Sequence, residues 1–185
     1  MYIVVGLGNP EEDYSKTRHN MGFNVINEIA KEYNVSLNKK KFDAIYGEIL
    51  LSSEKVIFIK PQTYMNLSGT SVKQFVDFYK VSIENLIIIY DDMDIEKGSI
   101  KIRKKGGPGN HNGMKSVEKE ISSDTFPRIR VGIGTPEFKN DIINYVLGHI
   151  PEEEYKILQN GIKEAANATI DIIKNGIDHA MNKYN

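Results

Sequence analysis

One histidine lies among polar residues that suit hydrolytic chemistry. His19 follows Thr17 and Arg18 in a polar segment between an expected first strand and an expected first helix. A histidine titrates near neutral pH, so it can accept a proton from water there. A carboxylate on its other ring nitrogen would fix its tautomer and stabilise the imidazolium that forms. The sequence therefore indicates His19 as the candidate general base of a loop-borne site.

The candidate partners of His19 occur in loops beside other expected strands. Asn9 follows the first strand, and Asn66 follows the strand that ends near Lys60. An acidic segment, residues 91–94, comes directly after the most apolar strand, and a glycine-rich segment, residues 106–113, precedes a helix. Asparagine amides can hold peptide-like groups or stabilise an oxyanion. Asx turns and helix caps would explain any one asparagine alone, but several around one histidine favour a site.

Several other chemistries are disfavoured. The chain has no cysteine, which excludes disulfides, thiolate nucleophiles and cysteine-based metal sites. No serine lies in a nucleophile elbow, which favours an activated water over a covalent acyl-enzyme. The histidine spacing matches no metal motif, so we expect neither a metal nor a cofactor. The glycines around Asn9 lack the third glycine of a dinucleotide loop, because Glu11 stands there.

Composition and charge indicate an ordinary globular protein. Of 185 residues, 40% are hydrophobic and 26% are charged, with a formal net charge of −1. No apolar run is long enough for a bilayer, and the first residues lack the pattern of a signal peptide. We therefore expect a cytoplasmic protein without a membrane partner. Basic residues concentrate in segments 97–115 and 39–41, which fits either lysine-guarded edge strands or a phosphate-binding stripe.

Alternating apolar runs and helical periods predict one domain over residues 1–185, with an α/β fold. We expect a three-layer α/β/α arrangement around a mixed, mostly parallel sheet, with an antiparallel hairpin on either side of Ser52-Ser53-Glu54. The expected strands are Tyr2–Gly6, Tyr46–Leu51, Lys55–Lys60, Leu86–Tyr90, Ser99–Arg103 and Ile129–Gly134. The expected helices are Gly22–Tyr33, Ser68–Tyr79, Asn112–Ile121 and a long region from Pro151 towards Met181, which Gly161 could interrupt and Gly176 could end.

Five ordered motifs give the sequence a specific resemblance. They are Gly6-Leu7-Gly8-Asn9-Pro10, Thr17-Arg18-His19-Asn20 with Tyr14 before and Gly22 after it, Pro61 to Gly69 with its Tyr64-Met65-Asn66 centre, Asp91-Asp92-Met93-Asp94, and His111-Asn112-Gly113. Together with Arg130-Val131-Gly132-Ile133-Gly134, they make the chain resemble bacterial peptidyl-tRNA hydrolase over essentially its whole length.

The resemblance implies an esterase that releases peptides from the 3′-terminal ribose of tRNA. His19 would be the catalytic base and Asp91 the carboxylate that orients it. Binding of the peptide and the ester would fall to Asn9, Asn66 and Asn112, with Tyr14 and Met65 lining the site beside them. Arg103 and Arg130 would bind the 5′-phosphate of the tRNA. A monomer acting on peptidyl-tRNA follows from the same resemblance.

The sequence departs from the family pattern in the glycine-rich loop and at Tyr64, where the aromatic ring is kept. It also leaves two other functions open. Asn110 replaces a usual glycine, and Pro108 stiffens the same loop. One alternative is a non-catalytic RNA-binding relative of the kind that assists splicing in plant organelles. The other is an unrelated hydrolase or nucleotide-binding enzyme with a small substrate. An inactive protein that still binds RNA would favour the first, and rapid turnover of RNA-free esters would favour the second.

Overall fold

The computed structural model describes all 185 residues, apart from the side chain of Lys139. In this described chain, seven strands form one sheet in the order β2-β3-β4-β1-β5-β7-β6. The strands are β1 (Tyr2–Gly6), β2 (Lys39–Lys41), β3 (Ala44–Leu51), β4 (Glu54–Pro61), β5 (Leu86–Asp92), β6 (Ile100–Arg103) and β7 (Arg128–Gly132). The neighbours β4, β1, β5 and β7 are mutually parallel, whereas β3 and β6 run against them. The expected mixed, mostly parallel sheet is confirmed.

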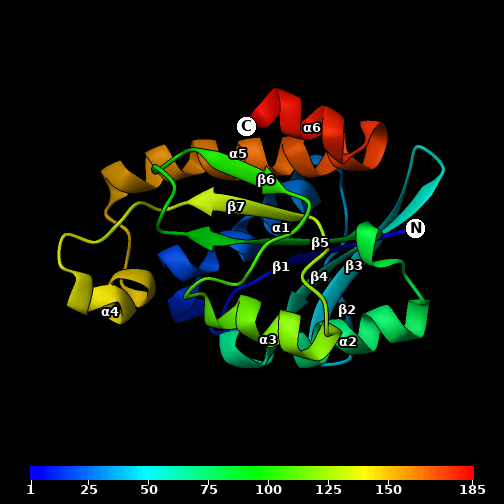
Figure 1. The fold of residues 1–185 in the computed structure, drawn as a ribbon, viewed down its shortest axis with the longest axis horizontal. Coiled ribbons are helices and arrows are strands. Elements are labelled where there is room, and N and C mark those ends of the chain that lie inside the picture. Colours follow the sequence, from blue (N-terminus) through cyan, green and yellow to red (C-terminus); the bar gives the residue numbers. More distant parts are fainter.

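Helices cover both faces of the sheet, which completes the expected three layers (Figure 1). The helices are α1 (Met21–Glu32), α2 (Ser68–Tyr79), α3 (Asn112–Ile121), α4 (Ile142–Leu147), α5 (Glu152–Asn175) and α6 (Ile177–Tyr184). Apolar residues of α1 and α5 pack on one face, in a cluster that includes Ile87 and Ile89 of β5. Those of α2 and α3 pack on the other face, with Leu86 and Ile88. Alternation of side chains along β5 therefore supplies both cores.

The local turns follow the chemistry of their residues. Ser52 and Ser53, with φ of 49° and 68°, form the two-residue turn of the predicted β3–β4 hairpin. Gly176, with φ of 88°, separates α5 from α6, so the expected end of the long helix is confirmed. Gly161 does not interrupt α5. A Cβ there would lie 3.3 Å from the backbone of Gly98, so this glycine allows close packing of the helix.

The two basic segments lie at opposite edges of the sheet. Residues 39–41 form edge strand β2, and the segment 97–115 contains edge strand β6. The edge-strand interpretation is therefore confirmed for residues 39–41, and in segment 97–115 for Lys101 and Arg103, the two basic residues within β6. Helix α4 has no counterpart among the expected elements, because its six residues are too few to give a clear helical period. None of the helices in the described chain combines the length and apolar character that crossing a bilayer requires.

The sheet topology creates a place for a ligand. From β1 the chain continues to β4 on one side, and from there it returns through α2 to β5 on the other. Crevices of open α/β sheets lie where the connections diverge in this way, outside the carboxyl ends of the strands. The loops after β1, β4 and β5 therefore converge at this edge.

Candidate active site

A cavity of about 720 Å³ opens at the carboxyl ends of the parallel strands. Its walls come from the loops after β1, β4 and β5, from the start of α3, from the glycine-rich loop and from α4. All the residues that the sequence assigned to a site line it: Asn9, Tyr14, His19, Met65, Asn66, Asp91, Arg103, Asn112 and Arg130. Segments far apart in the chain are thus brought to one surface.

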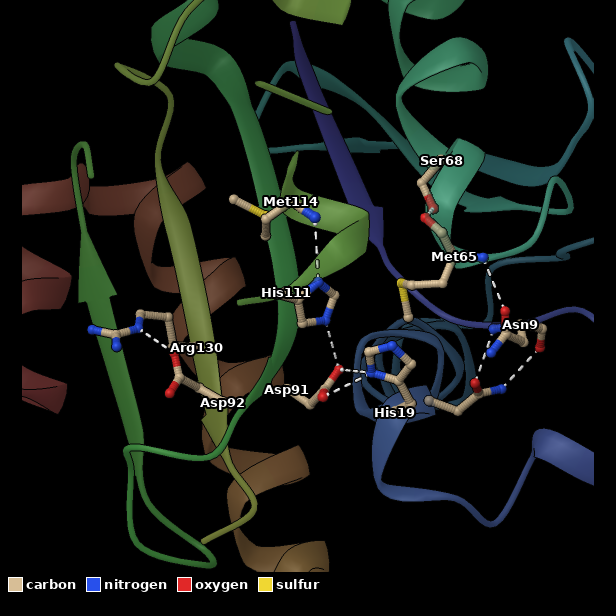
Figure 2. A network of polar contacts seen from close by, with 10 residues as sticks. Asn9, His19, Met65, Ser68, Asp91, Asp92, His111, Met114 and Arg130 are labelled. Atoms are coloured by element: carbon tan, nitrogen blue, oxygen red, sulfur yellow. Dashed lines mark hydrogen bonds and ion pairs between the residues drawn. The ribbon is translucent and has the colours of Figure 1, made fainter. Parts of the chain in front are cut away.

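His19 and Asp91 form a buried pair that lines this cavity, and Figure 2 shows their contact. Nδ1 of His19 lies 2.9 Å from Oδ2 and 3.0 Å from Oδ1 of Asp91. The two residues are 9% and 3% exposed, respectively. His19 belongs to a short 3-10 helix, η2 (Arg18–Asn20), directly before α1. The polar composition around His19 predicted a loop, but the segment Thr17–Asn20 is buried because each of its residues bonds to another part of the fold.

A second histidine bonds to the same carboxylate. Nε2 of His111 lies 2.9 Å from Oδ1 of Asp91, so Asp91 lies between two imidazole rings, as Figure 2 shows. His111 is the N-cap of α3, where Nδ1 accepts a hydrogen bond from the backbone N–H of Met114. Because Nδ1 accepts a hydrogen bond, the ring proton of a neutral His111 is on Nε2, which donates to Asp91.

These contacts also define the tautomer of neutral His19. An ionised carboxylate only accepts hydrogen bonds, so Nδ1 of His19 carries the hydrogen that faces Asp91. The lone pair is then on Nε2, the ring nitrogen that does not contact the carboxylate. His19 in this form is ready to accept a proton at Nε2.

Charge and burial act in opposition on both groups. Burial favours the neutral imidazole, but the charge of Asp91 and its hydrogen bond outweigh burial and raise the pKa of His19 above its ordinary value. Burial likewise favours a protonated Asp91, but the charges and hydrogen bonds of the two histidines hold the pKa of Asp91 well below its usual range. Asp91 therefore remains an anion wherever His19 changes its protonation state.

The asparagines differ in how firmly they are held. Asn20 donates from Nδ2 to the carbonyl of Asn9 and accepts from the N–H of Asn9, both at 2.9 Å. Oδ1 of Asn9 in turn accepts from the N–H of Met65 at 2.9 Å. This use of Oδ1 leaves the amide hydrogens of Asn9 as the groups available to a ligand. Asn66 and Asn112 are exposed in the cavity wall.

The backbone before Met65 is strained. Tyr64 has φ of 63° and ψ of 161°, a conformation that favours glycine, and it lines the cavity. Such strain costs about 1–3 kcal/mol and persists where surrounding contacts fix it. Here the contact from Met65 to Asn9 is one such restraint, and the Tyr64 hydroxyl also donates to Glu11.

The basic residues at the cavity differ in how far hydrogen bonds within the protein already hold their side chains. Nε of Arg130 donates to Asp92 at 2.7 Å, whereas Arg103 is exposed and bonds to the carbonyl of its neighbour Ile102. Lys105 also lines the cavity. Other members of the 97–115 segment bind the protein itself: Lys97 pairs with Glu154, Lys104 with Asp178, and Lys101 with the carbonyl of Asn185. Of these basic residues, Arg103, Lys105 and Arg130 are the ones that line the cavity.

The site also contains three groups that could hold a cation. One ligand atom each from His19, Asp91 and His111 lies within 4.8 Å of the others. Histidine and carboxylate ligands suit zinc. The sequence expectation of no metal rested on local spacing, which cannot register a group assembled from three distant segments. That expectation stays a prediction.

Two residues of this site were missed by sequence reasoning. His111 received no role, although its position before a helix and after a glycine-rich loop was a signal that it could cap the helix and face a ligand. Asn20 was named only as part of a motif, and its hydrogen bonds to Asn9 form only in the folded chain. His149 and His179 are exposed.

Fold and site together define an α/β protein with a histidine–carboxylate pair in a crevice at the topological switch point of its sheet, an arrangement suited to a hydrolase. A family model described as peptidyl-tRNA hydrolase matches residues 3–185. The chain belongs to the peptidyl-tRNA hydrolase family, and so to the aminoacyl-ester hydrolases.

Individual members of the family match the sequence of this chain over its full length. The peptidyl-tRNA hydrolases of Clostridium botulinum (strain Eklund 17B) and Alkaliphilus metalliredigens are each 50% identical to this chain over 185 residues. Both alignments cover 100% of this chain. They cover 96% of the Clostridium protein and 100% of the Alkaliphilus protein. The crystal structure of peptidyl-tRNA hydrolase from Acinetobacter baumannii is 35% identical, with a TM-score of 0.94 over 100% of this chain and 94% of that one.

Proposed function

We propose that this protein hydrolyses the ester between a peptide and the 3′-terminal ribose of tRNA, by means of a water that His19 activates. The observation that carries the proposal is the contact of Nδ1 of His19 with both oxygens of Asp91, inside a cavity lined by amides. This contact leaves Nε2 as the basic nitrogen. The family membership supplies the substrate class.

The reaction needs one proton acceptor that later becomes a donor. Nε2 of His19 takes a proton from water while the water oxygen bonds to the ester carbonyl carbon. The charge of Asp91 stabilises the resulting imidazolium. When the tetrahedral intermediate collapses, the bond from carbon to the ribose oxygen breaks and the imidazolium returns the proton to that oxygen. Free peptide and free tRNA result, with no covalent enzyme intermediate and no metal in any step.

Amide groups of the cavity would stabilise the charge that develops on the ester oxygen. Asn9 is suited to this, because its Oδ1 is already bonded to Met65 and its amide hydrogens are fixed in direction. Asn66 and Asn112 are exposed in the same wall and would hold the peptide backbone. Tyr14 and Met65 would complete the walls around the acyl group.

The tRNA would be held through its phosphates, which position a nucleic acid without reading its sequence. Arg103 is exposed at the end of β6, and Arg130 is held by Asp92 through Nε only, so both can direct guanidinium hydrogens to a phosphate. A cytoplasmic, monomeric protein fits this role, and both attributes are part of the proposal.

Hydrolysis of N-acetyl-aminoacyl-tRNA by the wild-type protein and by His19→Asn tests the proposal. Asparagine keeps a polar group beside Asp91 in this buried segment, and a thermal melt checks that the variant is folded. We expect the variant to lose turnover and to retain tRNA binding. Full activity of the folded variant would contradict the role of His19.

Two further substrates separate the alternatives. An aminoacyl-tRNA with a free amine and an RNA-free N-acetyl-amino-acid ester should both be poor substrates. Rapid turnover of the RNA-free ester would favour a small-molecule hydrolase. A wild-type protein that binds tRNA without hydrolysing any ester would favour the non-catalytic RNA-binding relative.

A further inference from the structure

Helix α4 forms one wall of the cavity but has no buried side chain that anchors it to the core. Ile142, Ile143, Val146 and Leu147 line the cavity, and no residue of the helix is buried. Six residues are also too few for a helix that is stable by itself. Figure 1 shows α4 at the end of the molecule to which the arrows of β5 and β7 point, and the chain passes from β7 through α4 into α5. Specific contacts must therefore fix its position.

The strongest of these contacts come from Arg18, the residue before His19. Nε and Nη2 of Arg18 donate to the two carboxylate oxygens of Glu154, at 2.8 and 2.9 Å. Nη1 donates to the carbonyl of Tyr145 at 2.9 Å, one of the last carbonyls of α4, which lack partners within the helix. The guanidinium carbon also lies 4.0 Å from the centre of the Tyr145 ring.

This arrangement joins three elements through nearly buried charges. The side chains of Arg18 and Glu154 are 9% and 14% exposed, and Lys97 lies 3.4 Å from the same carboxylate. A bidentate pair of this kind has a fixed geometry that lysine cannot reproduce. The Tyr145 hydroxyl donates to the carbonyl of Ile133, which ties the other side of the ring to the segment after β7.

The chain around Arg18 strengthens the same connection. Thr17 forms an isolated antiparallel bridge with His149, and the N–H of Ile150 donates to the carbonyl of Lys16. The segment that leads from α4 into α5 is thus attached to the residues that precede His19. This attachment uses atoms other than those that join His19 to Asp91.

We propose that Arg18 is a positioning residue that, through Glu154 and Tyr145, holds α4 as an apolar wall for the side chain of the amino acid next to the scissile ester. The inference rests on the proposed function. The aliphatic lining of α4, which Met93 extends, suits an apolar acyl side chain and offers nothing to a phosphate. Arg18 thereby sets which acyl groups are bound well, without touching the reacting atoms.

The test compares two substrates that differ only in this side chain, N-acetyl-leucyl-tRNA and N-acetyl-glycyl-tRNA. Glu154→Gln and Arg18→Lys should each raise KM for the leucyl substrate by about tenfold, because a gap of about 0.5–1 Å already removes roughly a quarter to a half of the attraction at each contact, summed over the whole wall. KM for the glycyl substrate should change by less than about threefold, because glycine has no side chain to contact this wall. kcat and its pH profile should stay near the wild-type values for both.

Glu153→Gln is the matched control, since Glu153 is exposed in the same first turn of α5 and changes the same charge without contacting Arg18. It should behave as wild type. Equal losses with both substrates, or a loss confined to kcat with a shifted pH profile, would overturn the proposal. Thermal melts show whether each variant is folded, and Glu154→Gln decides the question if Arg18→Lys does not fold. Failure of the wild-type protein to hydrolyse either substrate would instead refute the proposed function.

Discussion

Oδ1 of Asp91 lies 2.9 Å from Nε2 of His111 and 3.0 Å from Nδ1 of His19, so two histidines share one carboxylate oxygen. The backbone N–H of Met114 bonds to the far nitrogen of His111 and makes this ring a donor to Asp91. His19 bonds in addition to Oδ2. The basicity of His19 therefore depends on a residue that it does not bond to directly.

Replacement of His111 should make His19 more basic. The hydrogen bond from His111 stabilises the negative charge on Asp91, so its loss in His111→Ala leaves a carboxylate that attracts the imidazolium of His19 more strongly. The pKa of His19 rises further, and the acidic limb of kcat/KM moves to higher pH. A pH profile of the variant measures this. A limb that moves to lower pH would show that His111 acts on His19 in another way.

Asp91→Asn should slow the chemical step and move the pH dependence in the opposite direction. The pKa of wild-type His19 is raised by Asp91, and the base works only when neutral, so wild-type kcat/KM should rise with pH through a value above the ordinary histidine pKa of 6.5. Without the charge, this limb moves to lower pH while maximal kcat falls by about 10²–10⁴-fold. Substrate affinity should remain. An unchanged limb would mean that another group sets the profile.

Arg103→Gln should raise KM and reduce its dependence on salt, with little change in kcat. An exposed guanidinium that holds a phosphate contributes equally to the ground state and the transition state. Lys101→Gln is the control, because Lys101 is on the same strand but bonds to the carbonyl of Asn185 away from this cavity. Steady-state kinetics between low and high salt compare the two. A KM that does not respond to salt in the wild-type protein would exclude phosphate binding by this group.

Removal of divalent cations should leave hydrolysis unchanged. The contacts among His19, Asp91 and His111 have N–O distances of 2.9–3.0 Å, which are those of hydrogen bonds, so Nδ1 of His19, Nε2 of His111 and the Asp91 oxygens already have partners. Dialysis against a chelator, followed by metal analysis and an assay, tests this. Lost activity that zinc alone restores would establish a metal site on these three residues.

Local patterns predicted much of the architecture. The ranges of α2 and α3 match the expected helices, and the apolar run of β5 marks the centre of the sheet. Helix α4 could not be predicted, because its six residues bury no side chain and its position depends on Arg18 and Tyr145. The burial of His19 could not be predicted either, since polar residues become buried only where the fold brings partners to them.

Side-chain alternation explains which acidic residue meets His19. Asp91 shares its parity along β5 with Ile87 and Ile89, which pack on the face that α1 covers, and His19 directly precedes α1. Asp92 has the opposite parity and pairs with Arg130. The two-residue period of the strand can be read from the sequence. It favours Asp91 over Asp92 as the partner of His19, once it is known which face of the sheet α1 covers.

The sequence alone determined which residues could act and at which strand ends they would stand, because residue type and periodicity are local properties. The tertiary structure alone decided that Asp91 is shared by two histidines, that Asn20 orients Asn9, and that Arg18 holds α4. These relationships join residues that are 11 to 127 positions apart, and the packing of the whole sheet with its two helical layers sets their distances. No local pattern carries that information.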